Sequence, residues 1–349
     1  MLLIDFSGIT HPMTVISWNN TVESIKTEYN SIDKEIAIQS EDFNERFSLE
    51  FRARVLTTLL QIKKRYAKSN EEIVIAVDSK INWRKQEFPQ YKANRKINRD
   101  KDTIDWKFAF KIRNDLLDAL NEKFFFKVIK YENDNIGCEA DDIIAILAQY
   151  KEGREPITII SDDSDFYQLH GINGLKQYNY KNIQKTWEHA SKSLKIGDNV
   201  RVTPAQFTEL KILNGDRKDG VPNFLSDDDV WNDETKKPIR LGGKTALKIL
   251  NGDDKMVVKY GNLSDIRKSK YYLRNKKVID LNEIPDSIKD AVIDKYLTFE
   301  YKGSISSILN YLSSHVNVSS NHLFASAHDF QIRGIIKPKR KRRRSIFSS

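Results

Sequence analysis

The sequence predicts an α/β fold in which helices flank a mostly parallel central sheet, followed by a smaller helical domain. Short β-rich runs alternate with longer segments whose apolar residues recur at helical spacing. Acidic residues stand directly after several of the runs. Beyond about residue 200 the strand pattern stops and shorter helical patterns continue. Such alternation is typical of a parallel sheet, whose ligands lie beyond the carboxyl ends of its strands.

The first part of the chain contains the predicted strands and the longer helices. The strands are expected at 2–6, 72–78, 124–131, 157–161 and 175–179. Apolar spacing predicts helices at 43–68, 104–122 and 139–150. The insert at 17–42 has weak periodicity, so the sequence assigns it no element.

The second part of the chain is predicted to be helical. Helices are expected at 204–214, 244–251 and 286–296, with a polar connection at 226–238. We therefore divide the chain into a core at 1–200, a helical domain at 201–330 and a basic tail at 331–349.

The net charge and the single cysteine limit the classes of protein to which the chain could belong. The net charge is +9, but the run "KPKRKRRR" at 337–344 supplies most of it, so the rest is close to neutral. A basic tail attracts polyanions such as nucleic acid, although it can also serve as a solubilising tail or a localisation signal. The single cysteine, Cys138, allows no internal disulfide. No apolar run approaches the roughly 20 residues of a membrane span, so we expect no membrane partner and a cytoplasmic location.

Acidic residues recur where the predicted fold would bring them together. Taken singly, an acid at a strand end is usually solvated, and acids in a first helical turn are often caps. Taken together, crowded carboxylates repel one another, and Mg²⁺, which prefers oxygen ligands, offsets that repulsion. Two such ions about 4 Å apart can hold the attacking and leaving oxygens of a phosphodiester. The candidate acids are Asp5, Asp78, Glu139, Asp141, Asp142, Asp163, Asp165, Asp216 and Asp219.

A basic block with interleaved aromatic residues follows the second strand. Within "WRKQEFPQYKANRK", Lys92 and Arg95 are three residues apart and would be neighbours on a helix. Basic side chains bind phosphates, and aromatic rings stack on unpaired bases. The alternative is a solvated helix face whose aromatic residues pack inward. The candidate nucleic-acid-binding residues here are Arg84, Tyr91, Lys92, Arg95 and Lys96.

Five segments of the chain, in order, resemble the motifs of the 5′-nuclease (flap endonuclease) family. They are "LLIDFSG", "VIAVDSKINWRKQEFPQYKANRK", "GCEADDIIAILA", "IISDDSDFYQL" and "ILNGDRKDGVP". The tryptophan-containing basic block and the long insert after the last motif most resemble the ribonuclease H enzymes of T-even-type phages. The resemblance covers roughly residues 1–300.

The resemblance implies a Rossmann-like, PIN-like nuclease core with a helix-three-turn-helix second domain. It implies a structure-specific 5′-to-3′ nuclease, Mg²⁺-dependent, that acts on flap and nicked DNA and on RNA–DNA hybrids and removes RNA primers from lagging-strand fragments. By motif position, Asp5, Asp78, Glu139 and Asp141 would bind one ion, and Asp163, Asp165 and Asp216 the other. Mn²⁺ would be able to replace Mg²⁺. Asp142 and Asp219 match additional acids with direct or water-mediated roles.

The resemblance also implies roles for basic residues. Lys92 and Arg95 match the catalytic basic pair of the family, alongside Asp78 and Asp163 in the catalytic set. The segment 84–113 would contain an arch over a single strand. In the second domain, "IRLGGKTALKIL" matches a hairpin that binds the duplex backbone, which assigns that role to Gly242, Gly243, Lys244 and Thr245. Arg240 replaces the first glycine of that hairpin. The resemblance therefore does not decide whether this chain has the potassium site that many members of the family carry.

The expected partners are DNA and RNA–DNA hybrids, with a monomeric enzyme in the host cytoplasm if a phage encodes it. The last residues would be able to bind a sliding clamp or a single-strand-binding protein, or lie disordered. Other interpretations stay open from the residues alone. They are a non-catalytic flap or junction binder on the same scaffold, a metal-dependent glycosyltransferase with a DxD motif, and a single-domain metal-carboxylate ribonuclease.

Overall fold

The computed structural model describes residues 1–29, 33–67, 71–93, 95, 102–231, 235–316 and 320–330. The basic run 337–344, Lys96 and part of the predicted arch segment lie outside them. The described part contains a five-stranded sheet, in the order β3-β2-β1-β4-β5, in which every neighbouring pair is parallel. The fold class predicted from the sequence is therefore confirmed.

Each predicted strand is present, with ends shortened by a few residues. Their bounds are β1 Leu2–Asp5, β2 Ile73–Ala76, β3 Lys127–Ile129, β4 Ile157–Ile160 and β5 Leu175–Tyr178. Alternate residues of the strands face opposite sides, so Leu2 and Ile4 join one hydrophobic cluster while Leu3 joins another. Both faces of the sheet are thus buried, as is usual for parallel sheets.

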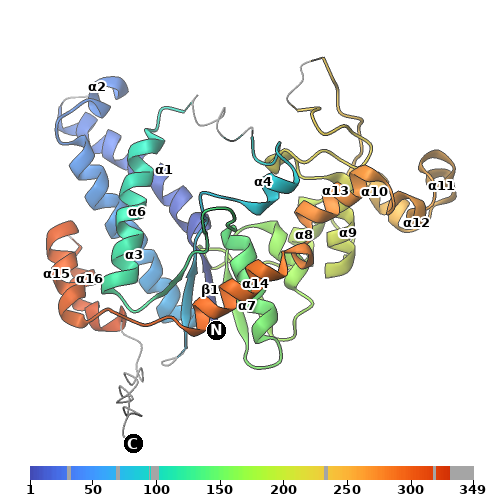
Figure 1. Cartoon of the computed structure of the whole chain (residues 1–349). Helices are drawn as coiled ribbons and strands as arrows, with labels where there is room; N and C mark the ends of the chain where they lie inside the picture. The colour runs from blue at the N-terminus through green and yellow to red at the C-terminus, as the bar shows by residue number, and fades with distance from the viewer. Residues whose placement is uncertain are drawn as a thin grey trace, which may run out of the picture.

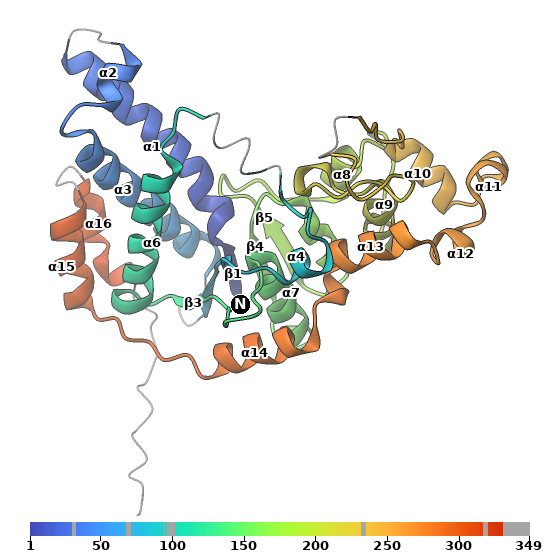
Figure 2. The ribbon, with the colours of Figure 1, turned by 45° about the horizontal axis from the view of Figure 1, so that its top comes forward.

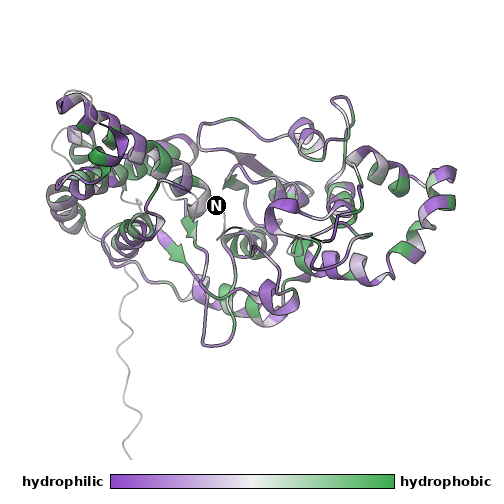
Figure 3. Cartoon of the chain, turned by 90° about the horizontal axis from the view of Figure 1, so that it is seen from above, coloured by the Kyte–Doolittle hydropathy of each residue, from purple (hydrophilic) through white to green (hydrophobic). Residues whose placement is uncertain are grey.

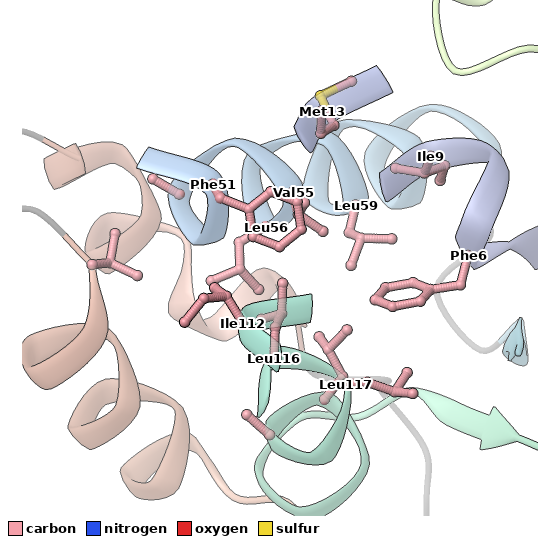
Figure 4. Close-up of a cluster of buried hydrophobic side chains, with 14 of the residues drawn as sticks. Phe6, Ile9, Met13, Phe51, Val55, Leu56, Leu59, Ile112, Leu116 and Leu117 are labelled. Carbon is pink, nitrogen blue, oxygen red and sulfur yellow. The ribbon is translucent and has the colours of Figure 1, made fainter. Parts of the chain in front are cut away.

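Three long helices cover the first face of the sheet: α1 (Phe6–Glu28), α3 (Phe43–Tyr66) and α6 (Trp106–Lys123). Figure 4 shows apolar side chains from these three helices converging on a common core. The short helix α2 (Lys34–Ile38) joins α1 to α3, and α15 (Ile305–His315) and α16 (Asn321–Ala325) pack beside α3 and α6 (Figure 1).

Helix α1 was not predicted from the sequence, although it spans much of the unassigned insert. It contains Pro12, which cannot donate a backbone hydrogen bond, and several β-branched residues that disfavour helices. Burial compensates for this poor local preference, since Ile9, Trp18 and Val22 are almost fully buried against α3.

The second face of the sheet is covered by α7 (Ala140–Lys151) and α14 (Asp286–Leu297). Helix α7 supplies an unbroken run of buried residues from Ile143 to Ala148, and α14 contributes Ile288 and Val292 to the same cluster. Figure 2 shows α14 running beneath the sheet, between α13 and α15.

A helical unit lies to one side of the sheet (Figures 1 and 2). Its own hydrophobic cluster includes Phe207, Leu210, Ala246 and Tyr272. In Figure 3 hydrophilic and hydrophobic residues alternate along its helices, as expected when one face of each packs on a core. Its helices are α8 (Trp187–Ser193), α9 (Pro204–Asn214), α10 (Gly243–Leu250), α11 (Asp254–Tyr260), α12 (Leu263–Ile266) and α13 (Lys270–Ile279).

The residues of the predicted second domain, 201–330, belong to more than one hydrophobic cluster. Helices α9 to α13 share the cluster of the helical unit. Residues from Leu281 onward instead rejoin the two clusters on the faces of the sheet. The predicted domain bounds stay a prediction, but the chain leaves the sheet for the helical unit and then returns to it.

Among the described residues, no helix combines the length and apolar character that crossing a membrane requires.

Replacing Ile288 by Ala should lower the free energy of unfolding by about 2–5 kcal/mol, because its side chain is fully buried between α14 and the sheet. Leu297→Ala, in the same helix, is the matched control. Leu297 is 60% exposed, so its removal should change the free energy by no more than about 0.5 kcal/mol. Urea unfolding of both variants measures the difference, and equal effects would show that α14 does not belong to the sheet core.

Candidate metal centre

Acidic residues follow the three central strands of the sheet. Asp5 ends β1 and caps α1, since its Oδ1 accepts a hydrogen bond from the Gly8 N–H at 2.9 Å. Asp78 follows β2, and Asp163 follows β4, where it caps a short 3₁₀ helix (Ser164–Leu169). Because β1 lies between β2 and β4, these strand ends lie at one edge of the sheet.

A cleft of about 510 Å³ opens at this edge and brings together residues from distant parts of the sequence. Asp5, Asp78, Asp141 and Asp163 line it, and we call these four residues the first carboxylate cluster. Asp141 reaches it from the first turn of α7. Lys92 and Arg95 line the same cleft. The structure therefore gathers acids and bases that the sequence places up to about 160 residues apart.

Backbone and hydroxyl groups fix the carboxylates of the first cluster. The Ser161 hydroxyl donates to Asp5 Oδ2 at 2.8 Å, and the Ala140 N–H donates to Asp78 Oδ1 at 3.0 Å. The Ser7 hydroxyl also donates to Asp78. Within the part of the chain that the structure describes, no basic side chain forms an ion pair with a member of this cluster.

The carboxylates of the first cluster make one another harder to ionise. Burial and the nearby Asp78 and Asp163 together raise the pKa of Asp5 to about 6, although the hydrogen bonds from Gly8 and Ser161 act to lower it. Burial and repulsion by Asp163 and Asp5 likewise raise the pKa of Asp141 well above its usual value. A cation in the cleft would relieve this repulsion.

A second group of acids forms ion pairs with two lysine side chains. The Lys211 ammonium bridges Asp165 and Asp216, with an Nζ to Oδ2 distance of 2.6 Å for Asp216. We call Asp165 and Asp216 the second carboxylate cluster. The Lys92 ammonium bridges Glu139 and Asp219, lying 3.5 Å from Asp219.

Burial and the lysine charges act in opposite directions on the pKa values of these acids. Burial alone would raise the pKa of Glu139, but Lys92 and Arg84 outweigh it and lower that pKa to about 2. Burial, together with repulsion from Asp163 and Asp216, raises the pKa of Asp165 to about 7, although Lys211 acts to lower it. A separate small cavity of about 10 Å³ is bordered by five acids: Glu139, Asp141, Asp165, Asp216 and Asp219. Because Asp141 also lines the cleft, it connects the first carboxylate cluster with the acids that pair with lysine.

Asp142 does not line the cleft, and its predicted direct or water-mediated role at the metal stays a prediction. Its fully buried carboxylate pairs with the Arg84 guanidinium at 2.7 Å and accepts from Trp83 Nε1 at 3.1 Å. It also accepts from the Glu139 N–H at 3.0 Å, which completes a capping box at the start of α7. Asp142 therefore positions the backbone of Glu139.

Arg84 and Tyr91 are also buried, and their predicted contacts with nucleic acid stay a prediction. Arg84 is 3% exposed and donates from Nε to the Val278 carbonyl at 2.8 Å. Tyr91 is 4% exposed, and its hydroxyl donates to Glu139 at 2.8 Å and to Asp219 at 3.0 Å. Neither side chain presents a surface on which a base could stack.

Lys92 and Arg95, by contrast, face the cleft as predicted for the basic pair. Lys92 adopts a left-handed backbone conformation with φ of 58°, and its N–H donates to the Asp219 carbonyl at 2.7 Å. Such a conformation is uncommon outside glycine and is held here by tertiary contacts. Arg95 pairs with Asp219 at 2.5 Å while half of its side chain stays exposed.

The predicted hairpin residues Gly242, Gly243, Lys244 and Thr245 form the start of α10, in the helical unit and outside the cleft. Lys244 is exposed there. A Cβ added to Gly243 would lie 1.9 Å from the Leu194 carbonyl oxygen, whereas one added to Gly242 would meet no atom within 4 Å. Close packing against Leu194 thus requires glycine at 243, whether or not the hairpin binds phosphate.

The first carboxylate cluster fits a hard divalent ion. Its donors are carboxylate oxygens, the ligands that Mg²⁺ and Mn²⁺ prefer, and its raised pKa values mark a crowded site without a counter-ion. The lysine ammonium groups in the adjoining acids show that cations are favoured there. Within the described ranges, no three acidic, histidine or cysteine side chains already stand in metal-binding geometry, so binding requires side-chain adjustment.

Sequence reasoning missed Lys211, Ser7 and Ser161. The roles of Ser7 and Ser161 could not be predicted from the sequence, because serine beside a strand end is common. Lys211 carried a weak one, since it interrupts the apolar run "LKIL" just before the "NGD" motif.

Two family profiles match successive parts of the chain. Residues 37–197 match a family described as 5′-3′ exonuclease, N-terminal resolvase-like domain. Residues 206–330 match a family described as T4 RNase H, C terminal. The chain is therefore similar to 5′-nucleases over two successive segments, residues 37–197 and 206–330. Both of the matched families are described by nuclease names.

Relatives of the chain cover different shares of it. Ribonuclease H of Enterobacteria phage T4 is 29% identical over 245 residues, which are 68% of this chain and 74% of the relative. The 5′-3′ exonuclease of Buchnera aphidicola is 29% identical over 61% of this chain and 63% of its own length. DNA polymerase I of Streptococcus pneumoniae is 26% identical over 57% of this chain, but only 20% of the polymerase is matched.

A solved structure shares the fold. The T5 D15 protein, co-crystallized with metal ions, has a TM-score of 0.54 and 15% identity, and the match covers 85% of this chain and 98% of that one. At this identity the likeness supports the fold alone.

Without divalent ions, Asp5→Asn should stabilise the protein at neutral pH. An acid whose pKa rises from 3.8 to about 6 on folding keeps its proton longer in the folded state, so wild-type stability falls as the pH rises from about 4 to about 6. Asn removes this loss, which amounts to roughly 3 kcal/mol above pH 6. Urea unfolding in a chelator at several pH values measures the difference between variant and wild type.

Asp134→Asn, which removes an exposed carboxyl, is the control and should follow the wild type throughout this pH range. A curve for Asp5→Asn that runs parallel to the wild type would contradict the repulsion within the first cluster.

Gly243→Ala should lower the free energy of unfolding by about 1–3 kcal/mol or more, because the added methyl group meets the Leu194 carbonyl and α10 must move. Gly242→Ala is the matched control and should leave stability within about 1 kcal/mol, since the added methyl group has open space. Urea unfolding curves compare the two neighbouring variants, and equal midpoints would refute the packing role of Gly243.

Proposed function

We propose that the chain is a structure-specific 5′-to-3′ nuclease that hydrolyses phosphodiesters by a two-metal mechanism. Its substrates would be flap and nicked duplex DNA and RNA–DNA hybrids, and its task the removal of RNA primers during lagging-strand replication. The matched families and the names of the relatives support this activity. The observation that carries it is the convergence of four carboxylates and two basic side chains in one cleft.

Divalent ions, Mg²⁺ first among them, would be held by the first and second carboxylate clusters and would supply Lewis-acid stabilisation of the phosphodiester. Hydrolysis of the bond to the 3′ oxygen leaves a 5′-phosphate and a 3′-hydroxyl. The hydrogen bonds from Ser161, Ser7 and the Ala140 N–H hold Asp5 and Asp78 in place for this role. Asp142, through the start of α7, orients Glu139 and Asp141.

Lys92 and Arg95 would bind the phosphate at the scissile bond. Both now pair with Asp219, and Lys92 also with Glu139. A phosphate in the cleft offers them a more highly charged partner, and charge-assisted contacts of this kind stabilise the negative charge that develops on its oxygens. Lys92 has a left-handed backbone conformation and lines the cleft, so its side chain is in place for this contact before substrate binds.

The helical unit would bind the duplex beside the scissile strand. The exposed Lys244 and the backbone at the start of α10 supply a positive charge and free N–H groups, both of which suit phosphates. Arg84 links this unit to the cleft, because it donates to the Val278 carbonyl of α13 and pairs with Asp142 at the start of α7.

Asp163→Asn and Asp78→Asn should each abolish cleavage while duplex binding persists. Asn keeps the oxygen that accepts from the Asp165 N–H or from the Ala140 N–H, so the fold should be retained, but it removes a charged metal ligand. Cleavage of end-labelled flap, nicked and hybrid substrates with and without Mg²⁺ is the assay, with gel-shift binding in parallel. Lys92→Ala should lower turnover about 10²-fold without loss of metal binding.

Asp162→Asn is the matched control, because this neighbouring carboxyl is 60% exposed and pairs with Lys185 outside the cleft. It should cleave like the wild type. Mg²⁺-dependent cleavage by both Asp163→Asn and Asp78→Asn would refute the assignment, and binding by the wild type without any cleavage would favour a non-catalytic flap binder.

A further inference from the structure

The two carboxylate clusters differ in how their negative charge is balanced. The second cluster, Asp165 and Asp216, contains the Lys211 ammonium, whose Nζ lies 2.6 Å from Asp216 Oδ2 and also contacts Asp165 Oδ1. The Lys211 side chain is 9% exposed, so this is a buried ion pair rather than a surface contact. The first cluster has no such partner among the described basic residues.

We propose that the Lys211 ammonium is a built-in counter-ion that occupies the second carboxylate cluster and competes with a divalent ion for it. Both cations need the same carboxylate oxygens, so they cannot bind them together. A divalent ion would therefore fill the first cluster at a low concentration, and would enter the second only when the lysine withdraws. This inference rests on the proposed function for the statement that the first cluster binds a divalent ion.

The packing around Lys211 fixes its backbone, so withdrawal of the ammonium group would involve the side chain alone. Helix α9 is closed at its start by a capping box between Thr203 and Gln206, with Pro204 in the first turn. Leu210 and Leu213, on either side of Lys211, are fully buried in the core of the helical unit. The charge is carried on a flexible four-carbon stem, which can withdraw without any movement of the helix.

The position of Lys211 also connects the second cluster with the helical unit. Helix α9 packs against α10 and α13, which belong to that unit, and against the 3₁₀ helix that carries Asp165. Binding of a duplex to the helical unit therefore acts on the element that supplies the counter-ion. The order in which the clusters fill would then depend on substrate as well as on the concentration of metal.

Titration of the full chain with Mn²⁺ alone, followed by the electron paramagnetic resonance of the free ion, tests the proposal. The wild type should bind one ion tightly and a second weakly. In Lys211→Met, which keeps most of the unbranched side chain but removes the charged end, the second ion should bind at least about tenfold more tightly. Lys211→Arg, which restores the charge, should return the second site to weak binding.

Lys127→Met is the matched control for loss of a buried lysine. Lys127 is 5% exposed and pairs with Glu72 at 2.9 Å on the far strand β3, so its replacement should leave Mn²⁺ binding unchanged. Thermal unfolding supplies a second readout. In a chelator Lys211→Met should melt below the wild type, and Mn²⁺ should raise its melting temperature by more than it raises that of the wild type.

Equal Mn²⁺ affinities at the second site of the wild type and Lys211→Met would overturn the proposal, as would two equally tight ions in the wild type. If Lys211→Met does not fold, Lys211→Gln, which keeps a polar end, takes its place under the same criteria. Failure of the wild type to bind any Mn²⁺ would instead contradict the proposed function, so the two failures are distinguishable.

Discussion

Mutual repulsion among carboxylates at the carboxyl edge of the sheet is the constraint on which the site depends. The parallel order β2-β1-β4 places Asp5 at this edge between the acids that follow the neighbouring strands. Burial and proximity raise the pKa of Asp5 and Asp141 there. Such repulsion lowers the free energy of unfolding. Binding of a cation to the folded state would raise that free energy again.

The protein manages this repulsion in two ways. Around Glu139 and Asp219, and around Asp165 and Asp216, lysine side chains supply the positive charge from within the chain. At the first cluster, hydroxyl and backbone donors orient the oxygens without neutralising them. The surrounding structure thus leaves one group of acids without a positive charge from the described part of the chain.

The sequence predicted the sheet and the gathering of acids well, because both follow from local patterns. Short β-branched runs ending in acids define strands such as β4, and parallel topology then places Asp163 near Asp5. Prediction failed where tertiary packing outweighed local preference, as in α1 with Pro12. It also failed for the orientation of single side chains. Spacing could not show that Asp142 turns inward to Arg84 while Asp141, one residue earlier, faces the cleft.

The return of the chain from α13 to α14 means that the helical unit is joined to the core by two covalent connections, one before α8 and one after α13. Two attachments limit the rotation of the unit relative to the sheet more than a single attachment would. The same arrangement makes the unit an insertion within an otherwise continuous α/β architecture. Its removal would leave two chain ends to be rejoined, on a sheet whose own cores would remain complete.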